Sequence, residues 1–225
     1  LLVLLPAEGQ GYADAADGAV KVLLEQWVRL LWDIGLEVGH SVRTIAHCTE
    51  EAMKDITVQT SLLEARLLMG HRRLFDQFVN TMKARLKPGL FFQAKQREQE
   101  QRHGRYHDAT HNLEPNIKES PGGLRDLQNV LWVIRAAGFG KSWSELARRG
   151  LITPREARLA QRHQAILQDL RIRLHYLAGR REDRLLFDFQ TTLADELGMS
   201  AKPPRCTSEM LMQRYYRAAK GVTQV

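Results

Sequence analysis

The sequence predicts a mainly α-helical protein in which a helical domain follows the remnant of a small α/β lobe. Two observations lead to this prediction. The first 44 residues contain two segments of strand length with a helical pattern between them. From residue 49 onward, apolar residues recur every three or four positions. We place the boundary between residues 1–55, the α/β lobe, and residues 56–225, the helical domain.

The α/β lobe is predicted as a strand, a helix and a second strand. Residues 1–5 form a continuous apolar run that Pro6 ends, which is typical of a strand covered on both faces. A helix is expected over residues 13–32, where apolar residues fall at helical spacing. A second strand is expected over residues 36–44, because apolar and polar side chains mostly alternate there.

The helical domain is predicted from periodicity and from capping residues. Asp55 is expected to cap the first helix, and Gly70 to end it. Capping boxes at Ser142 and Thr153 begin two later helices, the second with Pro154 at its first position. The expected helices cover residues 56–69, 71–86, 90–106, 124–137, 154–178, 191–197 and 209–221, with a linker over residues 200–205.

The loop over residues 106–126 is the strongest candidate for a functional site. Pro121, Gly122 and Gly123 turn the chain immediately before a helix, and a helix N-terminus offers backbone N–H groups to an anion. Lys118 and Arg125 flank this turn. We therefore predict that these two side chains contact nucleotide phosphates and that Gly122 and Gly123 assist them.

An alternative interpretation is that the same loop is tied together internally. Arg125 would then pair with Glu114 or Glu119, and both roles could coexist in one loop. The side chains of Asn112 and Asn116 are expected to bond nearby backbone groups, which is more common for asparagine in turns than contact with a base or ribose.

Composition narrows the class of protein. Lys and Arg number 33 against 26 Asp and Glu, giving a net charge of +7, which fits either a solvated basic surface or an anionic partner. Nucleic acid is a weak candidate, because aromatic residues are not interleaved with the basic ones. No apolar run is long enough to span a membrane. Cys48 and Cys206 form no disulfide framework or metal motif, which fits the cytoplasm.

Residues 112–126, Asn-Leu-Glu-Pro-Asn-Ile-Lys-Glu-Ser-Pro-Gly-Gly-Leu-Arg-Asp, resemble the central motif of the bifunctional PII uridylyltransferase/uridylyl-removing enzymes of the nucleotidyltransferase superfamily. The likeness extends along the chain through residues 36–44, 61–68 and 184–188. The resemblance implies an enzyme that uses UTP and Mg²⁺ to modify a tyrosine of the nitrogen-signalling protein PII. It also implies that a His-Asp hydrolase domain removes the group again in response to glutamine.

In that family, two catalytic aspartates stand in a Ser-Asp-x-Asp motif directly before a strand like residues 1–5. The resemblance therefore implies a fragment that begins just after this motif, ends before the hydrolase domain and lacks transferase activity. A third carboxylate usually lies on the neighbouring strand, where Glu37 is the candidate metal ligand. His40 and Arg43 are candidate phosphate contacts. An exposed strand glutamate and a hydrogen-bonded core histidine are the alternatives.

Two other functions fit the sequence. The chain could be a helical interaction module that docks PII or neighbouring domains without chemistry of its own. It could also be a metal-dependent phosphohydrolase built on His103, His107 and Asp108, since His103 and His107 are spaced like metal ligands on one helix face. Solvated histidines at a helix end are the simpler interpretation of that spacing.

Overall fold

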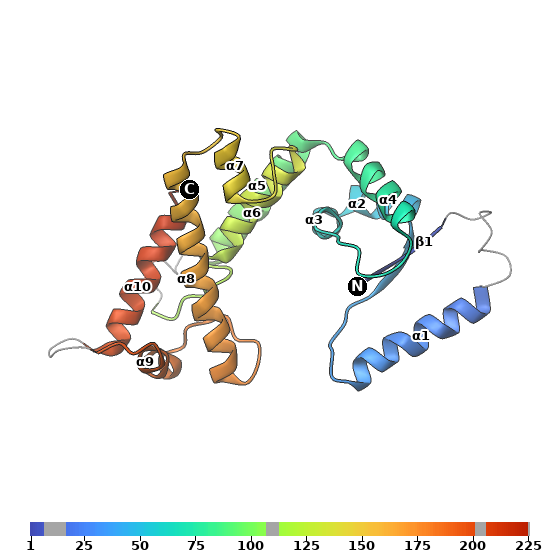
Figure 1. Cartoon of the computed structure of the whole chain (residues 1–225). Coiled ribbons are helices and arrows are strands. Elements are labelled where there is room, and N and C mark those ends of the chain that lie inside the picture. The colour runs from blue at the N-terminus through green and yellow to red at the C-terminus, as the bar shows by residue number, and fades with distance from the viewer. Residues whose placement is uncertain (7–16, 107–112, 201–205, 225) are drawn as a thin grey trace. The chain divides into compact units, whose positions relative to one another are not determined.

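The computed structural model describes residues 1–6, 17–106, 113–200 and 206–224, and it confirms a mainly α-helical fold with one small parallel sheet. The chain divides into two compact units, Leu1–Lys87 and Pro88–Val225 (Figure 1). The predicted domain boundary between residues 55 and 56 stays a prediction. Most of the predicted linker, at residues 201–205, lies outside the described residues.

The first unit is a two-stranded sheet with helices packed on it. Its elements are β1 (Leu2–Leu5), α1 (Asp17–Asp33), β2 (Ser41–Thr44), α2 (Ile45–Lys54), α3 (Ile56–Leu63) and α4 (Arg72–Arg85). β1 and β2 are parallel, with Leu2 opposite Ser41 and Leu5 opposite Thr44. Cys48, Ala52, Leu62 and Phe78 form the buried core of this unit, and Leu2 and Leu4 pack against it.

The second strand is shorter than predicted, because residues 36–40 make no ladder with β1. Gly35, at φ 85°, ends the preceding helix by donating to the carbonyl of Trp32. The indole of Trp32 then donates to the carbonyl of Val38 at 3.2 Å. Residues 36–40 therefore belong to the loop that connects α1 to β2. Glu37 lies before the strand rather than on it.

One further helix prediction in this unit was partly wrong, whereas the helix predicted over residues 13–32 is confirmed in its described part as α1. The helix predicted over residues 56–69 ends at Leu63, and the last two apolar side chains of that stretch, Leu68 and Met69, are exposed. Gly70 therefore does not cap it. α1 also leaves much of its predicted apolar stripe uncovered, with Leu23 64% and Leu30 55% exposed. The N-terminal cap at Asp55 is confirmed, since its carboxylate accepts from the Thr57 N–H at 2.6 Å.

The named elements of the second unit are all helices. Its helices are α5 (Pro88–Arg105), α6 (Leu124–Ala136), α7 (Trp143–Arg148), α8 (Pro154–Ala178), α9 (Phe187–Glu196) and α10 (Thr207–Val222). α8 is central and packs against α6, α7, α9 and α10 (Figure 1). Leu167, Leu170 and Leu174 on α8 are fully buried in the core that these helices share.

Both predicted N-terminal caps in this unit are present. The Ser142 hydroxyl accepts from the Glu145 N–H, and the Thr153 hydroxyl accepts from the Glu156 N–H. At Thr153 the capping box is complete, because its own N–H donates to the Glu156 carboxylate at 2.7 Å. Gly179, in the left-handed conformation, ends α8 where the sequence predicted. No helix in the described ranges is long and apolar enough to cross a membrane.

Candidate functional site

The loop before α6 is built around the side chain of Asn116. Its carbonyl oxygen accepts from the backbone N–H groups of Lys118 and Glu119 at 3.0 and 2.7 Å. The backbone N–H of Asn116 donates to the hydroxyl of Ser120, which is buried. The predicted side-chain-to-backbone bonding at Asn116 is confirmed. Asn112 lies outside the described residues.

A second segment of the chain anchors this loop. The Ile117 N–H donates to the carbonyl of Asp183, and the Leu185 N–H donates to the carbonyl of Pro115, forming a short antiparallel bridge. Ile117 and Leu185 are both fully buried. The structure therefore brings together residues 113–126 and 184–188, two stretches that carry the sequence resemblance.

The two glycines of the turn are required by close packing. Gly122 has φ 76°, a conformation that side chains rarely adopt, and a Cβ there would overlap the carbonyl of Ala219 on α10. A Cβ on Gly123 would lie 2.7 Å from the carbonyl oxygens of Lys118 and Ser120. Both positions face backbone rather than movable side chains, so a larger residue has no room.

The predicted free N–H groups at the N-terminus of α6 are not observed. Gly122 donates to the Asp126 carboxylate at 2.7 Å, and Gly123 donates to the carbonyl of Ser120. Residues 124, 125 and 126 likewise donate to loop carbonyls. An anion at this loop would therefore have to be held by side chains. A nucleotide contact at Gly122 and Gly123 stays a prediction, without the backbone donors on which it was based.

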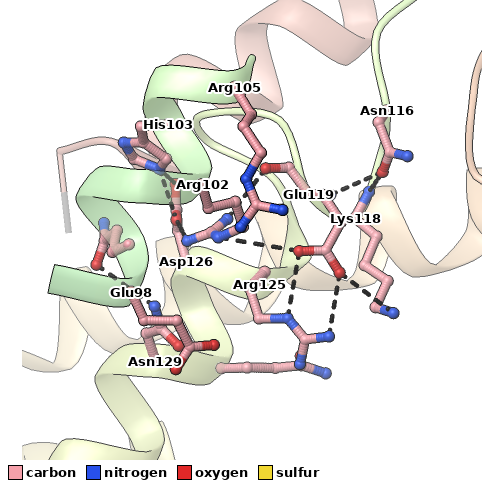
Figure 2. Close-up of polar contacts among 12 residues, drawn as sticks. Glu98, Arg102, His103, Arg105, Asn116, Lys118, Glu119, Arg125, Asp126 and Asn129 are labelled. Carbon is pink, nitrogen blue, oxygen red and sulfur yellow. Dashed lines mark hydrogen bonds and ion pairs between the residues drawn. The ribbon is translucent and has the colours of Figure 1, made fainter. Parts of the chain in front are cut away.

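A buried charge cluster connects the loop to α5 (Figure 2). Arg102 Nη2 donates to Asp126 Oδ1 at 2.6 Å, and Nη1 donates to the backbone carbonyl of Glu119 at 3.1 Å. His103 Nε2 lies 3.0 and 3.1 Å from the two oxygens of Asp126. Sequence reasoning missed Arg102. Its only signal is helical spacing from Phe91 and Lys95, which share the buried face of α5.

Glu119 is the common partner of the two predicted phosphate-binding side chains (Figure 2). Lys118 Nζ lies 3.2 Å from Glu119 Oε1, and Arg125 Nη2 donates to the same oxygen at 3.1 Å. Burial raises the pKa of Glu119, but hydrogen bonds and charge from Arg125 and Lys118 outweigh it and hold the pKa below its ordinary value. The internal pairing of Arg125 with Glu119 is thus confirmed.

Arg125 is held in place on two further sides. Its Nη1 donates to Gln128 at 3.0 Å, and its guanidinium lies 5.3 Å from the centre of the Trp132 ring. Lys118 and Arg125 remain accessible, with 29% and 24% of their side chains exposed. The structure therefore presents one cation on the loop and one in the first turn of α6, both within reach of solvent.

The predicted site residues of the first unit lie on β2 or in the segment just before it. His40 and Glu37 are exposed, and the His40 ring packs against Trp32 with centroids 5.9 Å apart. Arg43 lies on β2, opposite Leu4 of β1. Trp32 and residues 35–39, including Glu37, line an open hollow of about 570 Å³. The alternative of a core histidine at residue 40 is not observed.

No group of three His, Cys, Asp or Glu side chains among the described residues could hold a metal ion. Glu37 therefore has no complete set of carboxylate partners in the part of the chain that the structure describes. His103 is engaged by Asp126, and His107 and Asp108 lie outside the described residues. The phosphohydrolase hypothesis gains no support from this geometry.

Comparisons with known proteins place these features in context. A family model described as GlnD PII-uridylyltransferase matches residues 90–225. A protein of Nitrosospira multiformis named bifunctional uridylyltransferase/uridylyl-removing enzyme is 68% identical over 225 residues. Proteins with the same name from Aromatoleum aromaticum and Burkholderia orbicola are 54% and 52% identical. Each match covers 100% of this chain and 25% of the relative, so the chain spans about a quarter of their length. No solved structure matches the chain.

Proposed function

Because this chain belongs to the PII-uridylyltransferase family, we propose that it forms part of an enzyme that transfers UMP from UTP to a tyrosine of PII. The observation that carries the proposal is a pair of accessible cations, Lys118 on the loop before α6 and Arg125 in the first turn of α6. This loop also carries the family's central motif. We assign to these side chains the binding of the UTP phosphates.

The cations would act by neutralising charge. In the transfer, the tyrosine oxygen forms a bond to the α-phosphorus, while the bond from that phosphorus to the bridging oxygen of the leaving pyrophosphate breaks. The hydroxyl proton passes from the tyrosine to solvent water, and negative charge grows on the departing oxygen. A guanidinium and an ammonium fixed beside the phosphates stabilise this charge and hold the triphosphate in line. The Asn116 side chain fixes the backbone at Lys118 and Glu119, so the loop that carries Lys118 is already formed before a ligand binds.

A magnesium ion would supply further charge neutralisation at the triphosphate. The described residues do not by themselves provide its site, since no group of three possible ligands occurs among them. We keep Glu37 as a candidate ligand that needs additional carboxylates, and His40 and Arg43 as candidate phosphate contacts of the first unit.

The remaining parts of the proposal concern the longer protein. Removal of the uridylyl group and the response to glutamine are assigned to regions that this chain does not span. The proposed location is the cytoplasm, supported by the two unpaired cysteines among the described residues. Docking of PII or a neighbouring domain by the helical unit is the competing function.

Calorimetric titration of UTP with Mg²⁺ into the 225-residue chain tests the phosphate site. We expect binding that Lys118→Ala and Arg125→Ala each weaken. Arg173→Ala is the matched control, because it removes the same charge from an exposed ion pair on α8. Equal affinity of all variants would place the phosphates elsewhere. Absence of UTP binding together with retained association with PII would favour the docking function.

A further inference from the structure

Glu119 is surrounded by three cations, and this arrangement resembles an occupied anion site. Lys118 and Arg125 contact its carboxylate at 3.2 and 3.1 Å, and Arg102 Nε lies 3.9 Å from its second oxygen. The side chain is 23% exposed, so the carboxylate lies at the edge of the site rather than deep inside it. A phosphate that binds Lys118 and Arg125 must therefore compete with the Glu119 carboxylate, which already contacts both side chains.

The frame around the carboxylate does not depend on it. The backbone N–H groups of Lys118 and Glu119 are fixed by the Asn116 side chain. Arg102 is held by Asp126 and by the main-chain carbonyl of Glu119. Figure 2 shows that the Glu119 side chain points from this frame toward Lys118 and Arg125. Loss of the carboxylate therefore leaves the backbone bonds that position the cations intact.

The positive charges around Glu119 outnumber the negative ones, which favours binding of a more highly charged anion. Lys118, Arg125 and Arg102 carry three positive charges against the two negative charges of Glu119 and Asp126, so one positive charge is left over. A carboxylate and a phosphoryl group both accept paired hydrogen bonds from a guanidinium. A phosphate carries more charge and more acceptor oxygens than a carboxylate, so it can replace Glu119 between the two cations.

We propose that Glu119 is an internal competitor: its carboxylate occupies the position of a phosphate group between Lys118 and Arg125, and a phosphate-bearing ligand displaces it. This inference rests on the proposed nucleotide function and adds a residue of the protein that competes with the nucleotide for the same two cations. In the free protein, Glu119 keeps the two cations paired and lowers their affinity for simple anions. A ligand with several phosphates gains the site at the cost of releasing Glu119 to solvent.

Binding of inorganic pyrophosphate and of UTP to wild type and Glu119→Gln tests the proposal. The substitution keeps the size of the side chain but removes its charge, so both ligands should bind on the order of fivefold more tightly. Adding Arg125→Ala to Glu119→Gln should abolish the gain. Glu100→Gln removes the same charge from an exposed position on α5 and should leave both affinities unchanged. The gain should shrink as salt is raised, since the carboxylate is partly exposed.

The outcomes separate the two proposals. If wild type binds pyrophosphate and UTP, and Glu119→Gln binds them equally or less tightly, the competitor role is overturned while the phosphate site stands. If neither protein binds either ligand, both proposals fail.

A measurement on the unsubstituted protein guards against misfolding of the variant. The ¹³C signal of the Glu119 carboxyl carbon should shift when pyrophosphate binds, because the carboxylate loses its two cations. Binding without any shift of that signal would also overturn the competitor role.

Discussion

Arg102 and Asp126 form a buried ion pair at 2.6 Å, with 7% and 9% of their side chains exposed. They lie 24 residues apart, on α5 and α6, and together they hold the loop between those helices. Asp126 also accepts from Gly122, and Arg102 also donates to the main chain of Glu119. One ion pair thus determines where the turn and the proposed phosphate-binding side chains lie.

Removing one member of this pair should destabilise the helical unit strongly. Arg102→Met leaves the Asp126 carboxylate buried without its main cation, which costs roughly 3–5 kcal/mol of unfolding free energy. Asp126→Ala leaves both Arg102 and the Gly122 N–H without this partner. Urea denaturation measures both losses, and the double substitution should cost less than their sum.

Arg173→Ala is the control for this prediction, because its partner Asp169 is 41% exposed. Its loss should stay below about 1 kcal/mol. If Arg102→Met were as mild as Arg173→Ala, the ion pair would not hold the loop as described.

This pair marks the limit of what the sequence predicts. α8 was predicted from end to end, because Thr153 and Pro154 are local signals at its start and apolar residues recur at helical spacing along its length. Arg102 gave no such signal, since its partner lies on another helix and no local pattern identifies it. Long-range contacts of this kind are set by packing, which periodicity does not reveal.

The errors have the same origin. Apolar and polar residues do alternate over residues 36–40, but a strand also needs a neighbouring strand to bond with. The bonds that Gly35 and the Trp32 indole make hold this segment against the end of α1 instead. At α6, the Gly-Gly turn correctly predicted the helix start. It did not reveal that loop carbonyls and Asp126 would already accept the N–H groups. Lys118 and Arg125 were predicted as phosphate contacts from residue type and position, and that role stays a prediction. Glu119 was one of the two partners expected for Arg125.

The turn glycines should tolerate no Cβ. Gly122→Ala meets the backbone of Ala219 in a conformation unfavourable to alanine, and Gly123→Ala meets three carbonyl oxygens. Each should lower the free energy of unfolding by at least about 1–3 kcal/mol, because backbone cannot move aside as a side chain can. Thermal or urea unfolding of the two variants measures this effect.

Gly104→Ala is the matched control on α5. A Cβ there has nothing within 4 Å, and alanine favours helix over glycine by about 1 kcal/mol. That variant should be as stable as wild type or more so. A similar loss at residues 104, 122 and 123 would show that the clash is not the cause.

Gly221 on α10 should be restricted by a single side chain, His163 of α8. A Cβ at residue 221 would overlap the imidazole, with its Cδ2 and Cε1 atoms both 2.6 Å away. Gly221→Ala should therefore destabilise the α8–α10 contact by about 1–3 kcal/mol. His163→Ala in the same chain should restore much of the loss, because the obstacle is removed. A double variant no more stable than Gly221→Ala alone would contradict this explanation.

His163 should also make stability depend on pH. Its Nδ1 is buried without a hydrogen-bond partner among the described residues. Burial, and then the charge of Arg162, lowers the pKa of this histidine from its ordinary value of 6.5. The unfolded chain consequently binds a proton more readily than the folded one just below that pH, so stability falls as pH falls from about 6.5. The contribution is constant above that range. Unfolding free energies measured between pH 8 and pH 5 should show a steeper loss for wild type than for His163→Gln. Identical slopes would mean that His163 takes up its proton equally easily in the folded and unfolded chains.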